Sequence, residues 1–468
     1  MIAVRCFLAL CLLSVVCLAQ EPAPLEASAE SALHRAVAFF REQVSVEGSY
    51  LWRYSADLKV REGEGKADDQ TGWVQPPGTP DIGEAYLVAY SATKDDHYLD
   101  AARETANALV RTQLQSGGWT YRIHFDEASR AKQAYRVDGR TEGQNTTTLD
   151  DNTTQAALRF LMQFDKATDF KEEKIHECVM YGLDKLIEVQ YPNGAWPQRF
   201  SGPPDASEFP VVKASYPDSW SREFPARDYT HDYTFNDNTI ADVIDAFLDA
   251  ADIYGDDQYR AAALRGGEFI LLAQMPEPQP AWAQQYDRDM HPVWARKFEP
   301  PAVTGGESQG VMRCLIELTR RTGEKRFLEP IPRAIAYLRA SELPDGRLAR
   351  FYELQTNTPL YFTKDYQLTY FSDDMPTHYS FIGPSALDSI EAVYKAVLSG
   401  EEAAESSAPA APPADAVEKI IGALDERGAW VESGEMKYHE NVDIDRVIDC
   451  RTFAANVRAL AQFVAAQE

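Results

Sequence analysis

A repeated unit constrains the fold of this chain more than any other feature of its sequence. Each copy has an apolar-periodic helix, a break rich in Asp, Gly and Lys before an aromatic residue, a second helix, and a closing turn with Gly, Pro or Trp. Four copies follow one another, at residues 82–119, 155–197, 240–282 and 309–347. Apolar residues within them recur at the spacing of one helix face. Because a single helix pair cannot bury its apolar face alone, neighbouring pairs must stack.

Stacking that closes on itself predicts an all-α fold, an (α/α) toroid or barrel of repeated helix pairs with long loops and minor β structure. In such a ring the loops between helix pairs gather at one end and form a cleft. Short strands are expected near residues 119–121 and 351–353. Long segments between the repeats are predicted to be functional, as long loops in compact domains usually are. These segments are residues 200–233, 276–308 and 354–377.

The chain is expected to begin with a secretory signal. Arg5 supplies a positive charge, an apolar run follows, and small residues precede the end of the segment at Ala19. The run is too short to span a bilayer, so we expect a secreted or periplasmic protein without a membrane span. The expected divisions are a signal peptide at 1–19, an N-terminal helix and loop at 20–80, the toroid at 81–397, a linker-like loop at 398–416 and a closing helical segment at 417–468.

Net charge and cysteine count exclude several classes of protein. The formal net charge of −27 disfavours binding to nucleic acid or to an anionic membrane, because the overall field repels polyanions. A polyanionic ligand would need local cations, from arginines or a bound metal. The cysteines outside the signal, Cys178, Cys314 and Cys450, allow at most one disulfide and are expected to be buried as hydrophobic residues. We expect a monomer.

Two equivalent polar clusters predict a metal site. Asp150 and Asp151 precede the first helix of the second copy, and Asn236 and Asp237 stand at the same place in the third. Helix capping is the ordinary interpretation of such residues, but it explains one carboxylate rather than the whole cluster. Carboxylates from two neighbouring loops could instead supply hard oxygen ligands to one calcium ion. The predicted metal ligands are Asp150, Asp151 and Asp237.

The later loops carry candidate substrate-binding residues. Arg296 follows a tryptophan in one loop, and Arg347 and Arg350 lie in the next. A guanidinium offers a planar fork that suits a sugar carboxylate, although these arginines could equally pair with the abundant Asp and Glu residues. The tryptophans near the turns either pack beneath them or stack on sugars. This alternative concerns Trp119, Trp196, Trp282 and Trp294.

Five motifs, taken in order, resemble the family 10 pectate lyases (pectic acid lyases). The first motif is similar to that family's Ile-Asp-Asn-Gly-Ala-Thr sequence and is followed by Arg-Phe at the same distance. The chain departs from the family in two ways. Asp151 replaces the family's Asn and Asn152 its Gly, which alters the ligand set, and an insertion around residues 203–227 is expected to change the cleft. The resemblance covers roughly residues 80–395. The motifs lie at residues 149–160, 193–198, 233–239, 295–301 and 350–357.

The resemblance implies an (α/α) toroid that cleaves polygalacturonate or pectin by calcium-assisted (Ca²⁺) β-elimination. An arginine base would remove the C5 proton and leave a 4,5-unsaturated product, and Arg296 is our choice for this base. Asp150 and Asp237 match acids that help to hold calcium. Substrate-binding roles are expected for Arg347, Arg350, Trp196 and Asn236.

Other functions remain open from the sequence alone. A carbohydrate hydrolase on the same toroid could use Asp150 and Asp237 as its two carboxylates. A non-catalytic protein could hold pectin through calcium and aromatic residues. A triterpene cyclase is disfavoured by the high polarity, the expected export and the arginine-bearing motifs.

Overall fold

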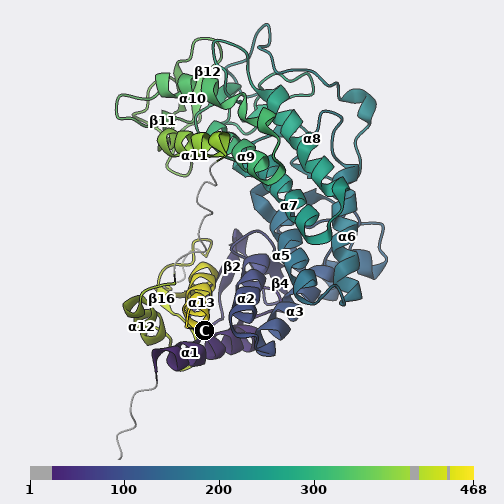
Figure 1. Ribbon diagram of the computed structural model, residues 1–468, viewed down its shortest axis with the longest axis vertical. Helices are drawn as coiled ribbons and strands as arrows, with labels where there is room; N and C mark the ends of the chain where they lie inside the picture. Colours follow the sequence, from purple (N-terminus) through teal and green to yellow (C-terminus); the bar gives the residue numbers. More distant parts are fainter. Residues whose placement is uncertain (1–23, 401–410, 440–442, 468) are drawn as a thin grey trace, which may run out of the picture.

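Long helices in successive pairs make up most of the molecule. The computed structural model describes residues 24–400, 411–439 and 443–467. The signal peptide predicted at 1–19 lies outside these residues. Within the described part, no helix is both long and apolar enough to cross a bilayer. The helix pairs curve around a common axis (Figure 1), so the predicted all-α toroidal architecture is confirmed.

One helix of each pair lines the inside of the curve, and the other covers the outside. Consecutive inner helices pack on one another, and each also packs on an outer helix. Along the curve, the inner helices in the described residues are α13 (Cys450–Ala465), α2 (Thr79–Thr93), α5 (Thr153–Ala167), α7 (Thr239–Tyr254), α9 (Gly306–Thr322) and α11 (Leu387–Ser399). The remaining helices are α1 (Leu25–Phe39), α3 (Asp96–Val110), α4 (Glu127–Arg130), α6 (Glu173–Glu188), α8 (Asp257–Ala273), α10 (Ile331–Ala340) and α12 (Ala414–Gly422).

The breaks within two of the pairs are short and capped by their own aspartates. Only residues 94–95 separate α2 from α3, where the Asp95 carboxylate accepts a hydrogen bond from the backbone N–H of His97. Asp256 does the same for Gln258 at the start of α8. An aspartate at this position satisfies a backbone donor that the helix itself leaves free. The Asp-rich breaks of the first and third copies are therefore helix starts.

Buried tryptophans pack under the turns that close the copies. The indole N–H of Trp196 donates to the backbone carbonyl of Leu186, at 2.8 Å, and its ring stacks on Phe247. Its exposed fraction is 0%, so it has no face to offer a sugar, and the predicted substrate-binding role of Trp196 is wrong. Three other tryptophans donate in the same way to the preceding outer helix. They are Trp119, Trp282 and, in the closing segment, Trp430.

Short antiparallel strands connect the helix pairs, and one sheet joins the two ends of the chain. The strand near 351–353 is confirmed, whereas the one expected at 119–121 lies slightly later. The sequence did not reveal the five-stranded sheet, in the order β16 (Glu432–Ser433), β17 (Arg446–Asp449), β1 (Arg53–Ser55), β2 (Arg61–Gly63), β3 (Gly65–Lys66). The other strands form a sheet of β10 (Ala302–Thr304), β12 (Phe351–Glu353), β13 (Pro359–Phe362) and β14 (Leu368–Thr369), and the pairs β4 (Thr71–Trp73) with β5 (Arg122–His124), β6 (Thr147–Thr148) with β7 (Arg199–Phe200), β8 (Tyr233–Thr234) with β9 (Gln285–Tyr286), and β11 (Leu348–Ala349) with β15 (Ile382–Gly383).

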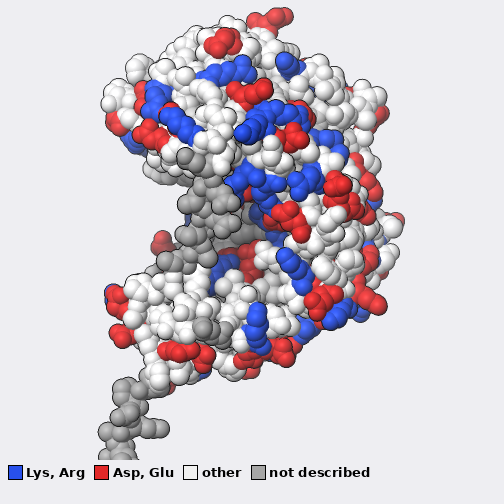
Figure 2. All heavy atoms as spheres, viewed as in Figure 1, with Lys and Arg blue, Asp and Glu red and all other residues white. Residues whose placement is uncertain are grey.

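The ring is open between α11 and α13, which stand apart at the two ends of the curve (Figure 1). Helix α12 packs on α1 and α13. Helices α11 and α12 each extend into the predicted linker at 398–416, and residues 401–410 between them lie outside the described part of the chain. Figure 2 shows the molecule hollowed between a lower lobe, which holds α1, α2 and α13, and an upper lobe, which holds α9, α10 and α11. Lys and Arg side chains gather on the upper lobe, although the formal net charge is −27.

Candidate active site

Two loops with the same backbone conformation bring the predicted metal ligands together. Each loop is a short 3-10 turn before an inner helix, and the two turns contact each other. Asp151 and Asp237 occupy equivalent left-handed positions, with φ values of 51° and 48°. An asparagine in the same conformation follows each of them. Asp and Asn tolerate this region better than most residues, which explains why the chain repeats an Asp-Asn pair here.

The carboxylates of Asp150, Asp151 and Asp237 converge as predicted. One oxygen from each lies within 4.8 Å of the others, the one such group of acids or histidines among the described residues. The Tyr121 hydroxyl donates to Asp150 Oδ2 at 2.7 Å, and the Gln75 side-chain amide donates to Asp151 Oδ2 at 2.9 Å. Asp150 Oδ1 is buried and has no hydrogen-bond partner within the described residues. This unpartnered oxygen and the oxygen-only donor set fit a hard divalent cation such as calcium.

Crowding of these acids changes their protonation. Burial, and then the charges of Asp150 and Asp237, raise the pKa of Asp151 to about 7. The pKa of Asp237 is raised by partial burial and by Asp150, against the opposing effect of Arg296 and Arg350. Like charges at short range disfavour simultaneous ionisation. A bound divalent cation would relieve this repulsion and favour all three carboxylates in their charged form.

Arg296 is held in a fixed orientation by a buried glutamate. Its Nε and Nη2 donate to the two carboxylate oxygens of Glu299, at 2.8 and 2.5 Å. The Tyr379 hydroxyl donates to the same carboxylate at 2.8 Å. Burial alone lowers the pKa of Arg296, but the hydrogen bonds and charge of Glu299 outweigh it, so the pKa of Arg296 is raised. The guanidinium is therefore a cation in the free protein.

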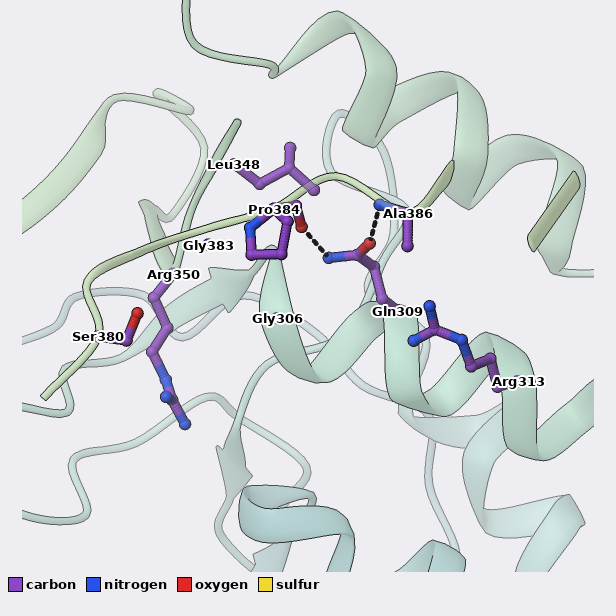
Figure 3. A pocket seen from close by; sticks show the side chains of 9 residues that line it. All are labelled: Gly306, Gln309, Arg313, Leu348, Arg350, Ser380, Gly383, Pro384 and Ala386. Carbon is purple, nitrogen blue, oxygen red and sulfur yellow. Dashed lines mark hydrogen bonds between the residues drawn. The ribbon is translucent and has the colours of Figure 1, made fainter. Parts of the chain in front are cut away.

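Arg350 reaches the same region from its position between β11 and β12. Its Nη2 donates to Glu307 at 2.5 Å and to Asn236 Oδ1 at 3.4 Å. The Tyr379 ring lies 4.3 Å from the Arg350 guanidinium and 5.5 Å from that of Arg296. One aromatic ring thus contacts both cations. Figure 3 shows Arg350 on the edge of a pocket beside α9, with its guanidinium directed away from Gln309 and Arg313.

Asn236 and Arg347 were both predicted to bind substrate, but both contact other protein residues instead. The side chain of Asn236 is buried and committed to its neighbours, since it donates to Asp237 and accepts from Gln284. Asn236 therefore links Asp237 to Gln284 by hydrogen bonds. Arg347 is exposed and pairs with Asp345 two residues away, with Nη2 2.7 Å from the carboxylate. The structure does not bring Arg347 to the acids, which contradicts its predicted contact with substrate in the same site.

Sequence reasoning missed the residues that hold this arrangement together. Glu299 lies inside the motif at residues 295–301. Glu307 lies in the first turn of α9, the inner helix after the two aspartate loops, so the repeat pattern could have indicated Glu307 as a site residue. Tyr121, Arg199 and Tyr379 reach the site from segments without such a signal. Their proximity depends on how distant loops pack.

One family of known proteins matches the sequence. The sequence matches the family model described as pectic acid lyase over residues 113–347, half of the 468-residue chain. No curated protein sequence matches the chain.

Solved structures of similar shape come from several enzymes. A family 10 polysaccharide lyase from Cellvibrio cellulosa matches with 22% identity and a TM-score of 0.45, over 69% of this chain and 97% of that one. A mutant of a lyase with the same description, in complex with trigalacturonic acid, matches with 22% identity and a TM-score of 0.46, over 68% and 98%. A cellobiose 2-epimerase from Bacillus thermoamylovorans matches with 12% identity and a TM-score of 0.46, over 94% and 98%.

Proposed function

This chain belongs to the pectic acid lyase family, and on that premise we propose that it cleaves polygalacturonate by calcium-assisted β-elimination, with Arg296 as the base. Membership of the family makes it a polysaccharide lyase of the pectate lyase type. The observation that carries the proposal is the convergence of Asp150, Asp151 and Asp237 beside two guanidinium groups.

β-Elimination suits a site of this composition. The C5 proton of a uronate lies α to the carboxylate, and its removal places negative charge on the carboxylate oxygens. Positive groups that face those oxygens stabilise the developing enediolate. A calcium ion held by the three aspartates would supply charge to that carboxylate as a Lewis acid. Arg350 would bind the same carboxylate through its planar fork.

The pair with Glu299 fixes the orientation of Arg296, but it also raises the pKa of Arg296 and so disfavours the neutral form that acts as a base. Glu299 occupies Nε and Nη2, which leaves Nη1 without a hydrogen bond to the described residues. In the neutral form of Arg296, Nη1 is therefore the nitrogen that would receive the C5 proton. The C4–O4 bond then breaks, and the departing O4 takes a proton from solvent. Because the raised pKa keeps nearly all of Arg296 charged, turnover should increase towards alkaline pH.

The direct test is an absorbance assay for unsaturated uronides. The purified protein is incubated with polygalacturonate at alkaline pH, with and without a chelator, and calcium is then restored. We expect absorbance to rise, to stop with the chelator and to resume with calcium. An unaffected rise would remove calcium from the mechanism. New reducing ends without a rise in absorbance would indicate that the protein is a carbohydrate hydrolase. Binding of polygalacturonate without cleavage would indicate a non-catalytic pectin-binding protein.

Replacement of Arg296 tests its assignment as the base. The variant Arg296→Ala should lose about 10²- to 10⁴-fold in kcat, because a positioned base contributes an effect of this size. Its binding of polygalacturonate should change less. Arg347→Ala is the matched control, since Arg347 is exposed and paired locally. Near-normal turnover of the Arg296 variant would contradict the assignment and make Arg350 the next candidate for the base.

We also propose that the protein is exported and monomeric. The segment before Ala19 supports export through its charge, apolar run and small residues. Expression of the full chain in a bacterial host, followed by fractionation and N-terminal sequencing, should find protein outside the cytoplasm that begins near Gln20. A single species slightly below the 52.4 kDa of the whole chain in size-exclusion chromatography would agree with a monomer.

A further inference from the structure

Arg199 lies next to the aspartate cluster and forms an ion pair with Asp150 that lacks a direct hydrogen bond. Strands β6 and β7 pair with Thr148 opposite Arg199, which places Arg199 beside the strand that leads into Asp150. Its Nη2 lies 3.8 Å from Asp150 Oδ2, beyond hydrogen-bond distance. Its Nε is buried and has no hydrogen-bond partner in the described part of the chain. The side chain is 39% exposed, so the guanidinium can meet a ligand from solvent.

The other arginines of the site differ in this respect. Arg296 is paired with Glu299 and Arg350 with Glu307, each through a direct hydrogen bond. The pair of Arg199 with Asp150 is longer than these hydrogen bonds. Asp150 Oδ2 also accepts from the Tyr121 hydroxyl, and one oxygen of Asp150 belongs to the converging group of carboxylates. Arg199 therefore retains more capacity for an added anion than either paired arginine.

The placement of Arg199 gives the site cations on two sides. Arg350 contacts the cluster through Asn236, beside Asp237, whereas Arg199 approaches it through Asp150. The Tyr121 ring lies 5.8 Å from the Arg199 guanidinium and restricts its position. We propose that Arg199 and Tyr121 form a second carboxylate-binding subsite, which takes the carboxylate of a uronate next to the sugar at the reaction centre.

This subsite would set substrate preference without taking part in the chemistry, and it rests on the proposed lyase function. Every sugar of unesterified polygalacturonate carries a carboxylate, so a chain that spans the aspartate cluster presents a second anion to Arg199. The guanidinium offers that anion two parallel donors. A methyl ester removes the charge and weakens the contact. The arrangement therefore favours unesterified segments.

The variant Arg199→Gln tests the subsite through kinetics. KM for polygalacturonate should increase about ten-fold, an energy within the range of a charge-assisted hydrogen bond, while kcat stays within about two-fold. The increase should be much smaller on highly methyl-esterified pectin, and Arg199→Lys should restore part of the loss. Arg347→Gln, an exposed arginine outside the site, should leave both substrates unchanged.

Three outcomes would overturn the subsite. One is a KM effect of equal size on both substrates, and another is a fall in kcat without a change in KM. The third is a higher calcium concentration for half-maximal activity, because Arg199 would then act on Asp150. Calorimetric titration of Arg296→Ala with and without Arg199→Gln, using oligogalacturonides, measures the same contact without turnover. If the wild type forms no unsaturated product, the lyase proposal fails, while this titration still decides whether Arg199 binds a uronate.

Discussion

At the scale of single residues, the acid that each arginine meets decides what the arginine can do. Arg347 is neutralised by Asp345 at the surface, whereas Arg296 is locked by Glu299 in a buried bidentate pair. Both partners are close in sequence, so these pairs were accessible to sequence reasoning. The pairing of Arg350 with Glu307 spans 43 residues and was not.

Glu299 should control both the orientation and the pKa of Arg296. The variant Glu299→Gln loses the ionic pair, so the guanidinium reorients and kcat should fall by about 10²-fold, a cost typical of misplaced catalytic groups. Removal of the negative charge also lowers the pKa of Arg296, so the alkaline rise of the rate should begin at lower pH. A full pH–rate profile measures both effects.

Tyr379→Phe supplies the control for this experiment. It keeps the ring between the two guanidinium groups and removes only the hydrogen bond to Glu299. We expect a smaller loss of kcat and little shift of the profile. An unshifted profile in Glu299→Gln would show that Arg296 is not the group that limits the rate at low pH.

At the scale of elements, the repeat places polar groups at the starts and along the concave faces of the inner helices. The aspartate turns come immediately before α5 and α7, and Glu307 lies in the first turn of α9. Further along α7, Asp242 and Asp245 lie near Arg159 of α5. Burial raises the pKa of Asp242 to about 7, opposed by Arg159 and supported by Asp245.

The raised pKa of Asp242 predicts how stability depends on pH. The unfolded chain releases this proton near its ordinary pKa of about 4, whereas the folded chain keeps it to about 7. The free energy of unfolding therefore decreases as pH rises from 4 to 7, and the loss is complete above 7. Asp242→Asn should remove this loss, so its Tm should exceed that of the wild type increasingly from pH 4 to 8.

Thermal unfolding of Asp242→Asn and Asp289→Asn across this range makes the comparison. Asp289 is exposed in a loop, so its replacement should shift Tm equally at every pH. A constant difference for Asp242→Asn would mean that the Asp242 carboxyl is already ionised at low pH in the folded protein.

At the scale of the whole molecule, the two ends of the described chain form one unit. Helix α13 packs on α2 and α1, and β17 pairs with β1 (Figure 1). The Phe453 ring of α13 stacks on Phe40, with ring centroids 3.4 Å apart, and meets Tyr86 of α2 edge-on. The closing segment thus completes the core around the first repeat.

Loss of this contact should destabilise the lower lobe. Phe453→Ala removes a fully buried ring and should cost about 3–5 kcal/mol in free energy of unfolding, as measured by chemical denaturation. Val393→Ala in α11 is the control, because Val393 is exposed at the open end of the ring and should change stability little. Equal effects of the two substitutions would indicate that α11 is covered in solution.

The sequence by itself determined the helix pairs, their order and the two aspartate loops, because helix periodicity, capping and left-handed Asp-Asn turns depend on neighbouring residues. It also determined that Cys178, Cys314 and Cys450 are buried, and the structure finds all three free. Only the tertiary structure decided that Trp196 packs beneath a turn, that Arg347 stays outside the site and that Arg199 and Tyr379 enter it. These outcomes depend on contacts between residues far apart in the chain, whose distances local patterns do not encode.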